Sequence, residues 1–288
     1  MTNKNSGLLK TAFGVFSFAL GFLVNQNLPA QASSLIHTFS NPGEVGTIDT
    51  STGIFTPIII NTPLLTDIAL SEDKQLFGAS FSQLYSLDLE TETFTLIGNL
   101  GVNNLNGLGF DNNGVLYGTG GGDFYSIDTN SGLATQIANI SNFLSAGDIV
   151  FNPDRNNFLA TSATSNRTKL FSIDLDGTAK EIGDIGFQGV FGLFFENQTL
   201  YGYTANREQI VIDIDTGKGT FDKDVTGTLK SIGGAASLPS TASVNPGPLS
   251  IPEPSNFLGL LGLSFAGIGT RIKRRKKFER KSRSCFEL

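Results

Sequence analysis

Short apolar stretches recur along residues 33–238, and Gly, Asn, Asp and Ser separate them. The segment 106–140 contains four such stretches. Within it Leu108 and Phe110 share one face of an extended chain, as do Tyr125 and Ile127, because side chains two positions apart in a strand point the same way. The pattern predicts four short β-strands joined by tight turns in each repeat.

Two sequence elements mark the repeat. One is an apolar residue followed by an aspartate and a turn, with spacings of 39, 40, 46 and 39 residues between Asp49, Asp88, Asp128, Asp174 and Asp213. The other reads DIAL, GLGF, DIVF, GLFF and GGAAS at residues 67–70, 107–110, 148–151, 192–195 and 233–237. Four strands in a period of about 40 residues are typical of a β-propeller, so we expect an all-β fold.

The phase of the repeat predicts how the ring closes. Four complete repeats cover residues 67–100, 106–140, 148–185 and 192–225. Residues 35–60 match only the last three strands of a repeat, and residues 231–238 match only a first strand. We therefore expect five four-stranded blades, the fifth built from both ends of the domain, so that no strand edge is left unpaired. The 46-residue spacing places a polar insertion, residues 160–169, between the second and third strands of its blade.

Charge is distributed unevenly along the chain. Residues 33–252 hold 9 Lys and Arg against 23 Asp and Glu, which gives a net charge of −14. This acidic domain argues against a nucleic-acid partner, because affinity for nucleic acid comes from neutralising phosphates. The single cysteine, Cys285, leaves residues 33–238 without disulfide or thiol chemistry, and a domain of this size can be exported without disulfides.

Residues 1–32 read as a secretory signal. Lys4 and Lys10 provide positive charge, residues 12–24 are apolar, and Ala30 and Ala32 form the small-x-small pattern of a cleavage site. The alternative is a transmembrane anchor, but the apolar stretch is shorter than the roughly 20 residues that span a bilayer. We therefore expect the domain at 33–238 to be exported.

The end of the chain changes in composition. Residues 239–251 are rich in Pro and Ser and carry no charge, which is typical of an extended linker. Residues 257–269 are apolar or small, and this pattern predicts a short membrane helix. The basic residues that follow, at 271–277, would stay in the cytoplasm. They are Arg271, Lys273, Arg274, Arg275, Lys276 and Lys277.

The order Pro252-Glu253-Pro254, apolar run, basic cluster resembles the PEP-CTERM sorting signal over about the last 35 residues. The resemblance implies that an exosortase, a membrane-embedded cysteine protease, recognises Pro252, Glu253 and Pro254 and removes the tail. It also implies that Arg271 and the residues after it form the cytoplasmic stop. The protein would then cross the inner membrane, stay anchored transiently, and reach the cell surface or the medium. The repeats also resemble the Gly-Leu-x-Phe blades of exported bacterial propellers, a resemblance that concerns the fold.

The sequence offers little catalytic chemistry. His37 is the only histidine, and it is predicted to lie on a strand near the start of the domain, so neither a nucleophile–histidine site nor a zinc site is expected. The repeated aspartates are interpreted as caps of their turns. The alternative is calcium binding by Asp174 with Asp176 or Asp213 with Asp215. Residues 118–122, GTGGG, are read as a loop and not as a phosphate site.

We therefore expect a non-enzymatic exported propeller without a cofactor, which binds a polysaccharide or a surface protein. The alternative is a secreted carbohydrate-active enzyme with two acidic residues around the propeller channel. Two carboxyls about 5–10 Å apart in a channel lined with aromatics would favour the enzyme. Carboxylates confined to turn caps would favour the binding role.

Overall fold

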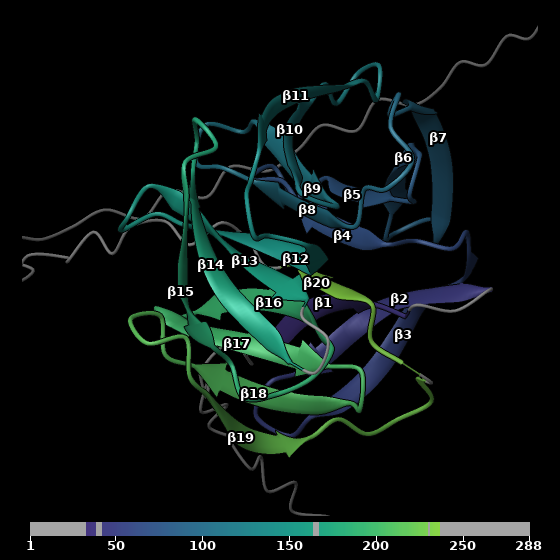
Figure 1. The fold of residues 1–288 in the computed structure, drawn as a ribbon. Helices are drawn as coiled ribbons and strands as arrows, with labels where there is room; N and C mark the ends of the chain where they lie inside the picture. The colour runs from purple at the N-terminus through teal and green to yellow at the C-terminus, as the bar shows by residue number, and fades with distance from the viewer. Residues whose placement is uncertain (1–32, 39–41, 164–166, 230, 237–288) are drawn as a thin grey trace, which may run out of the picture. The chain divides into compact units, whose positions relative to one another are not determined.

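The computed structural model describes residues 33–38, 42–163, 167–229 and 231–236, and these form five four-stranded antiparallel sheets around a central axis (Figure 1). The domain is a five-bladed β-propeller, as the repeat predicts. The membrane helix predicted at residues 257–269 lies outside the described residues. The described part of the chain contains no helix, so no helix there is long and apolar enough to cross a membrane.

Four blades are continuous in sequence. The first contains β4 (Asp67–Leu70), β5 (Leu76–Ala79), β6 (Gln83–Asp88) and β7 (Thr93–Asn99). The second contains β8 (Gly107–Phe110), β9 (Leu116–Gly120), β10 (Asp123–Ile127) and β11 (Ala134–Asn139). The third contains β12 (Ser145–Asn152), β13 (Asn157–Ala163), β14 (Thr168–Asp174) and β15 (Ala179–Asp184). The fourth contains β16 (Val190–Glu196), β17 (Thr199–Thr204), β18 (Glu208–Ile212) and β19 (Gly219–Asp224).

The fifth blade joins the two ends of the domain. Its inner strand, β20 (Gly234–Ala236), pairs antiparallel with β1 (Ser33–His37), so that Ala235 faces Ile36. β1 continues through β2 (Gly43–Asp49) to the outer strand β3 (Ile54–Thr62). The predicted closure by one C-terminal strand and three N-terminal strands is therefore confirmed. The pairing of β20 with β1 covers the edge that β1 would otherwise leave unpaired.

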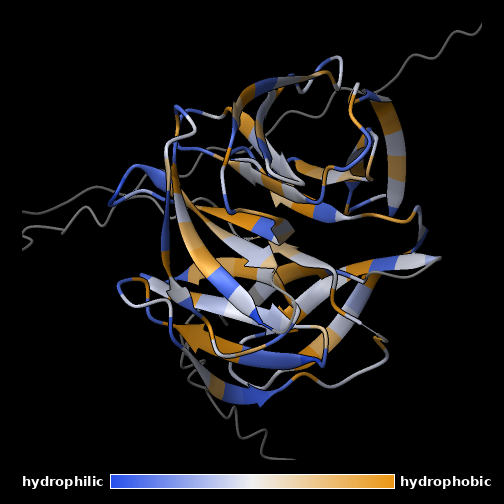
Figure 2. Cartoon of the chain, viewed as in Figure 1, coloured by the Kyte–Doolittle hydropathy of each residue, from blue (hydrophilic) through white to orange (hydrophobic). Residues whose placement is uncertain are grey.

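Each pair of neighbouring blades buries a separate apolar cluster. Alternating strand residues supply these clusters, and Figure 2 shows the resulting change between hydrophobic and hydrophilic positions along the strands. Between the second and third blades, the fully buried Phe158 contacts Tyr117, Phe124 and Phe151, with ring centroids 5.1, 6.0 and 5.2 Å away. Aromatic packing of this type stabilises the contact between the two blades.

A β-bulge recurs between the third and fourth strands of the four continuous blades. The register shifts after Leu84, Phe124, Leu170 and Gln209. A bulge increases the local twist of a strand pair, and each propeller blade is strongly twisted from its inner to its outer strand. The repeat in the sequence does not reveal this feature, because one unpaired residue does not disturb the hydrophobic alternation enough to be seen.

Two sequence predictions are wrong in detail. Residues 160–163 of the expected insertion belong to β13, so the third blade has a longer hairpin and a shorter loop than predicted. Residues 118–120 belong to β9 and are not a loop. A side chain at Gly118 would press on Leu105 and Ile127, so these glycines serve close packing within the blade.

Candidate functional site

The five inner strands, β4, β8, β12, β16 and β20, surround the channel of the propeller (Figure 1). One position from each inner strand lies in a layer at the same level of the channel, and hydrogen bonds from backbone amides to two aspartate side chains link these strands. The members of this layer are Asp67, Gly107, Asp148, Gly192 and Gly234. Two carboxyls and three glycines thus share one level of the channel, which makes this layer the candidate site.

Both carboxyls are engaged by backbone amides of other blades. Asp67 accepts hydrogen bonds from the N–H of Ile68, at 2.9 Å, and from that of Leu108 in the second blade, at 2.6 Å. Asp148 Oδ2 accepts from Leu193 of the fourth blade at 2.6 Å and from Ala235 of the fifth at 3.1 Å. Charge-assisted bonds of this length are among the stronger ones in proteins.

The two side chains are inaccessible and lie close together. Asp67 is 0% exposed and Asp148 is 1% exposed, and each carboxyl is near enough to influence the charge on the other. Burial raises the pKa of Asp67 well above its usual value, and repulsion by Asp148 raises it further. Burial also raises the pKa of Asp148, while the N–H groups of Leu193 and Ala235 act in the opposite direction.

His37 lies beside this layer, at the end of β1. A side chain added at Gly234 would meet both the Asp67 carboxyl and His37 Nε2. The imidazole is fully buried, and burial lowers the pKa of His37 to about 4, although backbone groups of Thr38, Thr66 and Gly233 oppose the shift. His37 is therefore neutral at neutral pH. It lies on a strand as predicted, but the sequence did not indicate its position next to the channel carboxyls.

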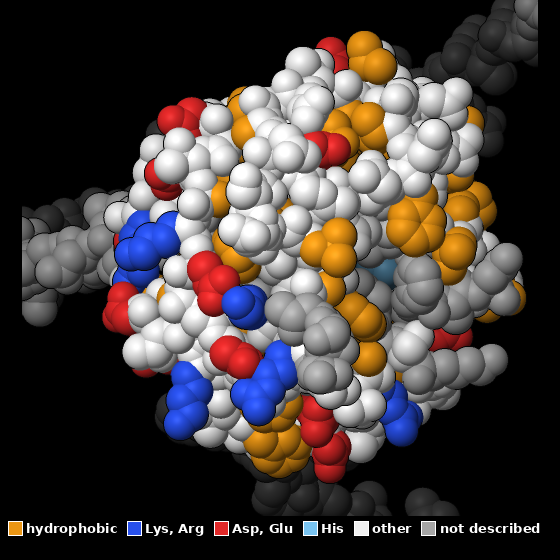
Figure 3. All heavy atoms as spheres, viewed as in Figure 1, with side chains coloured by type: hydrophobic (Ala, Val, Ile, Leu, Met, Phe, Trp, Pro, Cys, Tyr) orange, Lys and Arg blue, Asp and Glu red, His pale blue; other side chains and the backbone are white. Residues whose placement is uncertain are grey.

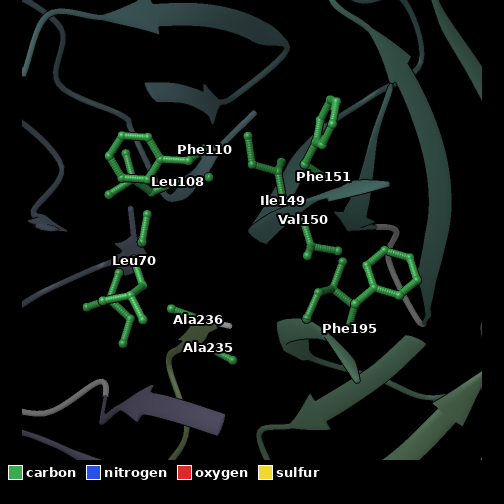
Figure 4. A pocket seen from close by; sticks show the side chains of 13 residues that line it. Leu70, Leu108, Phe110, Ile149, Val150, Phe151, Phe195, Ala235 and Ala236 are labelled. Atoms are coloured by element: carbon green, nitrogen blue, oxygen red, sulfur yellow. The ribbon is translucent and has the colours of Figure 1, made fainter. Parts of the chain in front are cut away.

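One end of the channel, beyond the carboxyl layer, is apolar and almost filled. Figure 4 shows the side chains around it, including Leu70, Phe110, Phe151, Phe195 and Ala236. The cavity between them has a volume of about 30 Å³, which is room for one water molecule. A sugar residue cannot enter it.

A larger cavity of about 110 Å³ lies on the other side of the carboxyl layer. Its walls come from residues at, or directly before, the starts of the inner strands, together with Phe81 of the β5–β6 turn. We call it the mouth cavity, and it is lined by Thr66, Phe81, Asn106, Ala146, Gly147, Phe191 and Gly233. Asn106 Oδ1 is buried without a hydrogen-bond partner among the described residues. Figure 3 shows one face of the molecule, on which hydrophobic side chains gather around a hollow.

The turn aspartates mostly have the role predicted for them. Asp49, Asp88, Asp128 and Asp213 each accept hydrogen bonds from backbone N–H groups two and three residues later. In the third blade the turn is capped instead by Asp176, whose Oδ1 accepts from the Thr178 N–H at 2.8 Å. This turn is shorter, so the later aspartate reaches the amide.

Calcium binding at these turns is not favoured by the geometry. Asp213 Oδ1 already accepts two backbone amides, and Asp215 forms an ion pair with Arg155. In the part of the chain that the structure describes, no group of three or more His, Cys, Asp and Glu side chains converges as metal ligands do. The predicted sorting motif (Pro252, Glu253, Pro254), the cleavage residues Ala30 and Ala32 and the basic cluster at 271–277 lie outside the described residues.

The pairing of Asp67 and Asp148 was not predicted from the sequence. One signal was present: in two of the five repeats, aspartate replaces the glycine that opens the GLGF element. The repeat does not indicate that these two blades direct their carboxyls to the same point on the axis.

Comparison with known proteins supports the fold. No family model matches the chain, and no curated protein matches it. A chain from the crystal structure of a nidogen/laminin complex is similar, with a TM-score of 0.54 and 12% identity over 71% of this chain and 98% of that one. A protein of unknown function from Bacteroides thetaiotaomicron has a TM-score of 0.50 and 15% identity over 69% of this chain and 58% of that one. At such identities both likenesses show the fold alone.

Proposed function

We propose that this chain is an exported propeller that an exosortase-type protease processes at its C-terminal tail, and that acts outside the cell by binding polysaccharide or protein without catalysis. The order of Pro252-Glu253-Pro254, apolar run and basic cluster supports the sorting step. The acidic domain and its propeller fold agree with a binding role at a surface, since propellers present loops at both ends of a channel.

The observation that favours binding over catalysis is the complete burial of Asp67 and Asp148. A glycosidase holds two carboxyls on either side of a bound glycosidic bond, about 5–5.5 Å apart when it retains configuration and about 6.5–9.5 Å apart when it inverts. The carboxyls of Asp67 and Asp148 are buried and already accept four backbone N–H groups, so a glycosidic bond cannot reach them. The geometry therefore weighs against hydrolysis at this pair.

The mouth cavity is the part of the channel that supports ligand contact best. Phe81 and Phe191 offer aromatic surface, and Thr66 and Asn106 add polar groups to the lining. Pockets that bind small molecules or single residues of a polymer combine apolar walls with few polar groups in this way. A single sugar ring or side chain at the end of a larger ligand is the expected occupant.

Binding to a panel of extracellular polysaccharides and surface proteins tests this proposal. Phe81→Ala should weaken binding about tenfold with little change in melting temperature. Phe94→Ala is the matched control, because Phe94 on the outer strand β7 is 41% exposed, against 42% for Phe81, but lies outside the mouth cavity. Equal effects of the two substitutions would contradict a site at the mouth. Glycan hydrolysis that Asp148→Asn abolishes would instead support the enzyme.

A further inference from the structure

The carboxyl layer connects all five blades. Asp67 on β4 reaches β8 through the Leu108 amide, and Asp148 on β12 reaches β16 and β20 through the Leu193 and Ala235 amides. The two buried carboxyls lie close together and so bring these two sets of strands to one point on the axis. Removal of either side chain would break hydrogen bonds that link different blades, which no hairpin joins.

The glycines of the layer make this arrangement possible. A methyl group at Gly234 would overlap the Asp67 carboxyl, and one at Gly107 would overlap the Thr119 hydroxyl. The absence of a side chain at Gly234 therefore leaves room for the Asp67 carboxyl.

The hydrogen-bond pattern requires a proton between the carboxyls. The oxygens of Asp67 accept the Ile68 and Leu108 amides, and Asp148 Oδ2 accepts two further amides. Asp148 Oδ1 is buried and receives no N–H or hydroxyl hydrogen from the described residues. A proton on Asp67 satisfies this oxygen, and it also removes the repulsion between two buried charges that lie close together.

Few other charges act on the pair. Among the described residues, β8, β16 and β20 contribute glycines, Leu108, Leu193 and Ala235 to this part of the channel, and none of these titrates. From β1 only His37 is close, and it is uncharged at neutral pH. The residues that line the mouth cavity are likewise uncharged. No neighbouring cation therefore replaces the shared proton.

We propose that Asp67 and Asp148 share one proton and act as a clasp that holds the propeller ring closed, and that loss of this proton at rising pH loosens the ring at β20. β20 is the weakest point because it has three residues and is held by β1 on one side and by Asp148 from within. The inner strands of the other blades are each tied to their blade by a hairpin.

The direction of the pH effect follows from proton binding. The folded protein keeps a proton on the pair that the unfolded chain releases above a pH of about 4. Because the folded state binds more protons, the pair loses stabilising free energy as pH rises from that point to the raised folded pKa. Over this pH range the melting temperature should fall by up to about 3–5 °C per pH unit for a chain of this size.

Asp148→Asn in the full-length protein tests the clasp. The amide oxygen can accept the Leu193 and Ala235 amides, and the amide N–H can donate to ionised Asp67, so the variant imitates the protonated pair at every pH. We expect the difference in melting temperature between variant and wild type to grow in favour of the variant as pH rises from 4 to 9. At pH 8 the Ala235 amide should exchange its hydrogen about tenfold faster in the wild type than in the variant.

The control is Asp128→Asn, which removes an exposed carboxyl that caps the turn after β10. Its difference from the wild type should stay constant over the same pH range above 5. A constant difference for Asp148→Asn as well would overturn the shared proton. If Asp148→Asn does not fold, carbon NMR of the wild-type carboxyls decides: one buried aspartate must titrate well above a pH of about 4, and normal titration of both refutes the clasp.

Discussion

The hydroxyl of Tyr203 on β17 lies 2.8 Å from the hydroxyl of Ser34 on β1, and both side chains are buried. The contact joins the fourth blade to the N-terminal strand of the fifth. Tyr203 also donates to Gln209 Oε1 at 3.2 Å and stacks on Phe194 with a centroid distance of 5.3 Å. Burial raises the pKa of Tyr203, so the phenol stays protonated and keeps its donor.

Tyr203→Phe should therefore lower the free energy of unfolding by about 1–3 kcal/mol, because it leaves the Ser34 hydroxyl and Gln209 Oε1 without this partner. The ring and its stacking remain. Chemical denaturation measures the loss. In a double-mutant cycle with Ser34→Ala, the two substitutions should couple, and strict additivity would mean that the hydrogen bond contributes nothing.

Gly234→Ala should destabilise the fifth blade, since the new methyl group would overlap the Asp67 carboxyl and crowd His37. Overpacking at a rigid site costs about 1–3 kcal/mol. The double variant Asp67→Gly/Gly234→Ala should recover part of the lost stability, although Asp67→Gly alone is destabilising. Thermal melts of the three variants measure this. Purely additive losses would contradict the contact.

His37 should limit stability in acid. Because burial holds the imidazole neutral down to about pH 4, while the unfolded chain binds a proton below about 6.5, the folded state loses stability as pH falls between these values. The loss attributable to His37 amounts to roughly 3 kcal/mol. Glutamine does not titrate, so in His37→Gln the stability should change less as pH falls from about 6.5 to 4. A wild-type and a variant profile that run parallel from pH 7 to 4 would exclude this role.

Asp49→Asn should weaken the turn after β2. The hydroxyls of Ser51 and Thr52 donate to this carboxylate and lower the pKa of Asp49 to about 2. Its stabilising effect is therefore present above a pH of about 4 and disappears as pH falls toward 2. We expect a small drop in melting temperature at pH 7 that vanishes at low pH. Glu72→Gln, also an exposed acid, is the control and should change neither value.

Replacing Pro252, Glu253 and Pro254 with alanine should leave export intact and keep the protein in the membrane. The two prolines hold this stretch extended and remove backbone donors, which suits binding as an unfolded strand to a protease. Mass spectrometry of the extracellular fraction should find a mature protein that begins near Ser33 and ends close to the motif. Peptides beyond Lys273 in that fraction, or normal release of the alanine variant, would argue against processing.

Much of the architecture was present in local patterns. The period-2 alternation located the strands, and the incomplete repeats at residues 35–60 and 231–238 predicted that β20 would complete the blade of β1. Strand existence and repeat phase depend on residues close in sequence. The details that failed, the cap at Asp176 and the strands at residues 118–120 and 160–163, depend on turn length and on packing against a neighbouring blade.

By itself the sequence determined that five blades form and which strands close the ring, because each blade is a local unit with its own alternation and turns. Only the tertiary structure decided that Asp67 and Asp148 meet. Their repeats are two blades apart, and nothing local distinguishes them from the surface aspartates except the glycine each replaces. The pairing arises because ring closure brings one level of all inner strands to a common axis, where Gly234 leaves room for the Asp67 carboxyl.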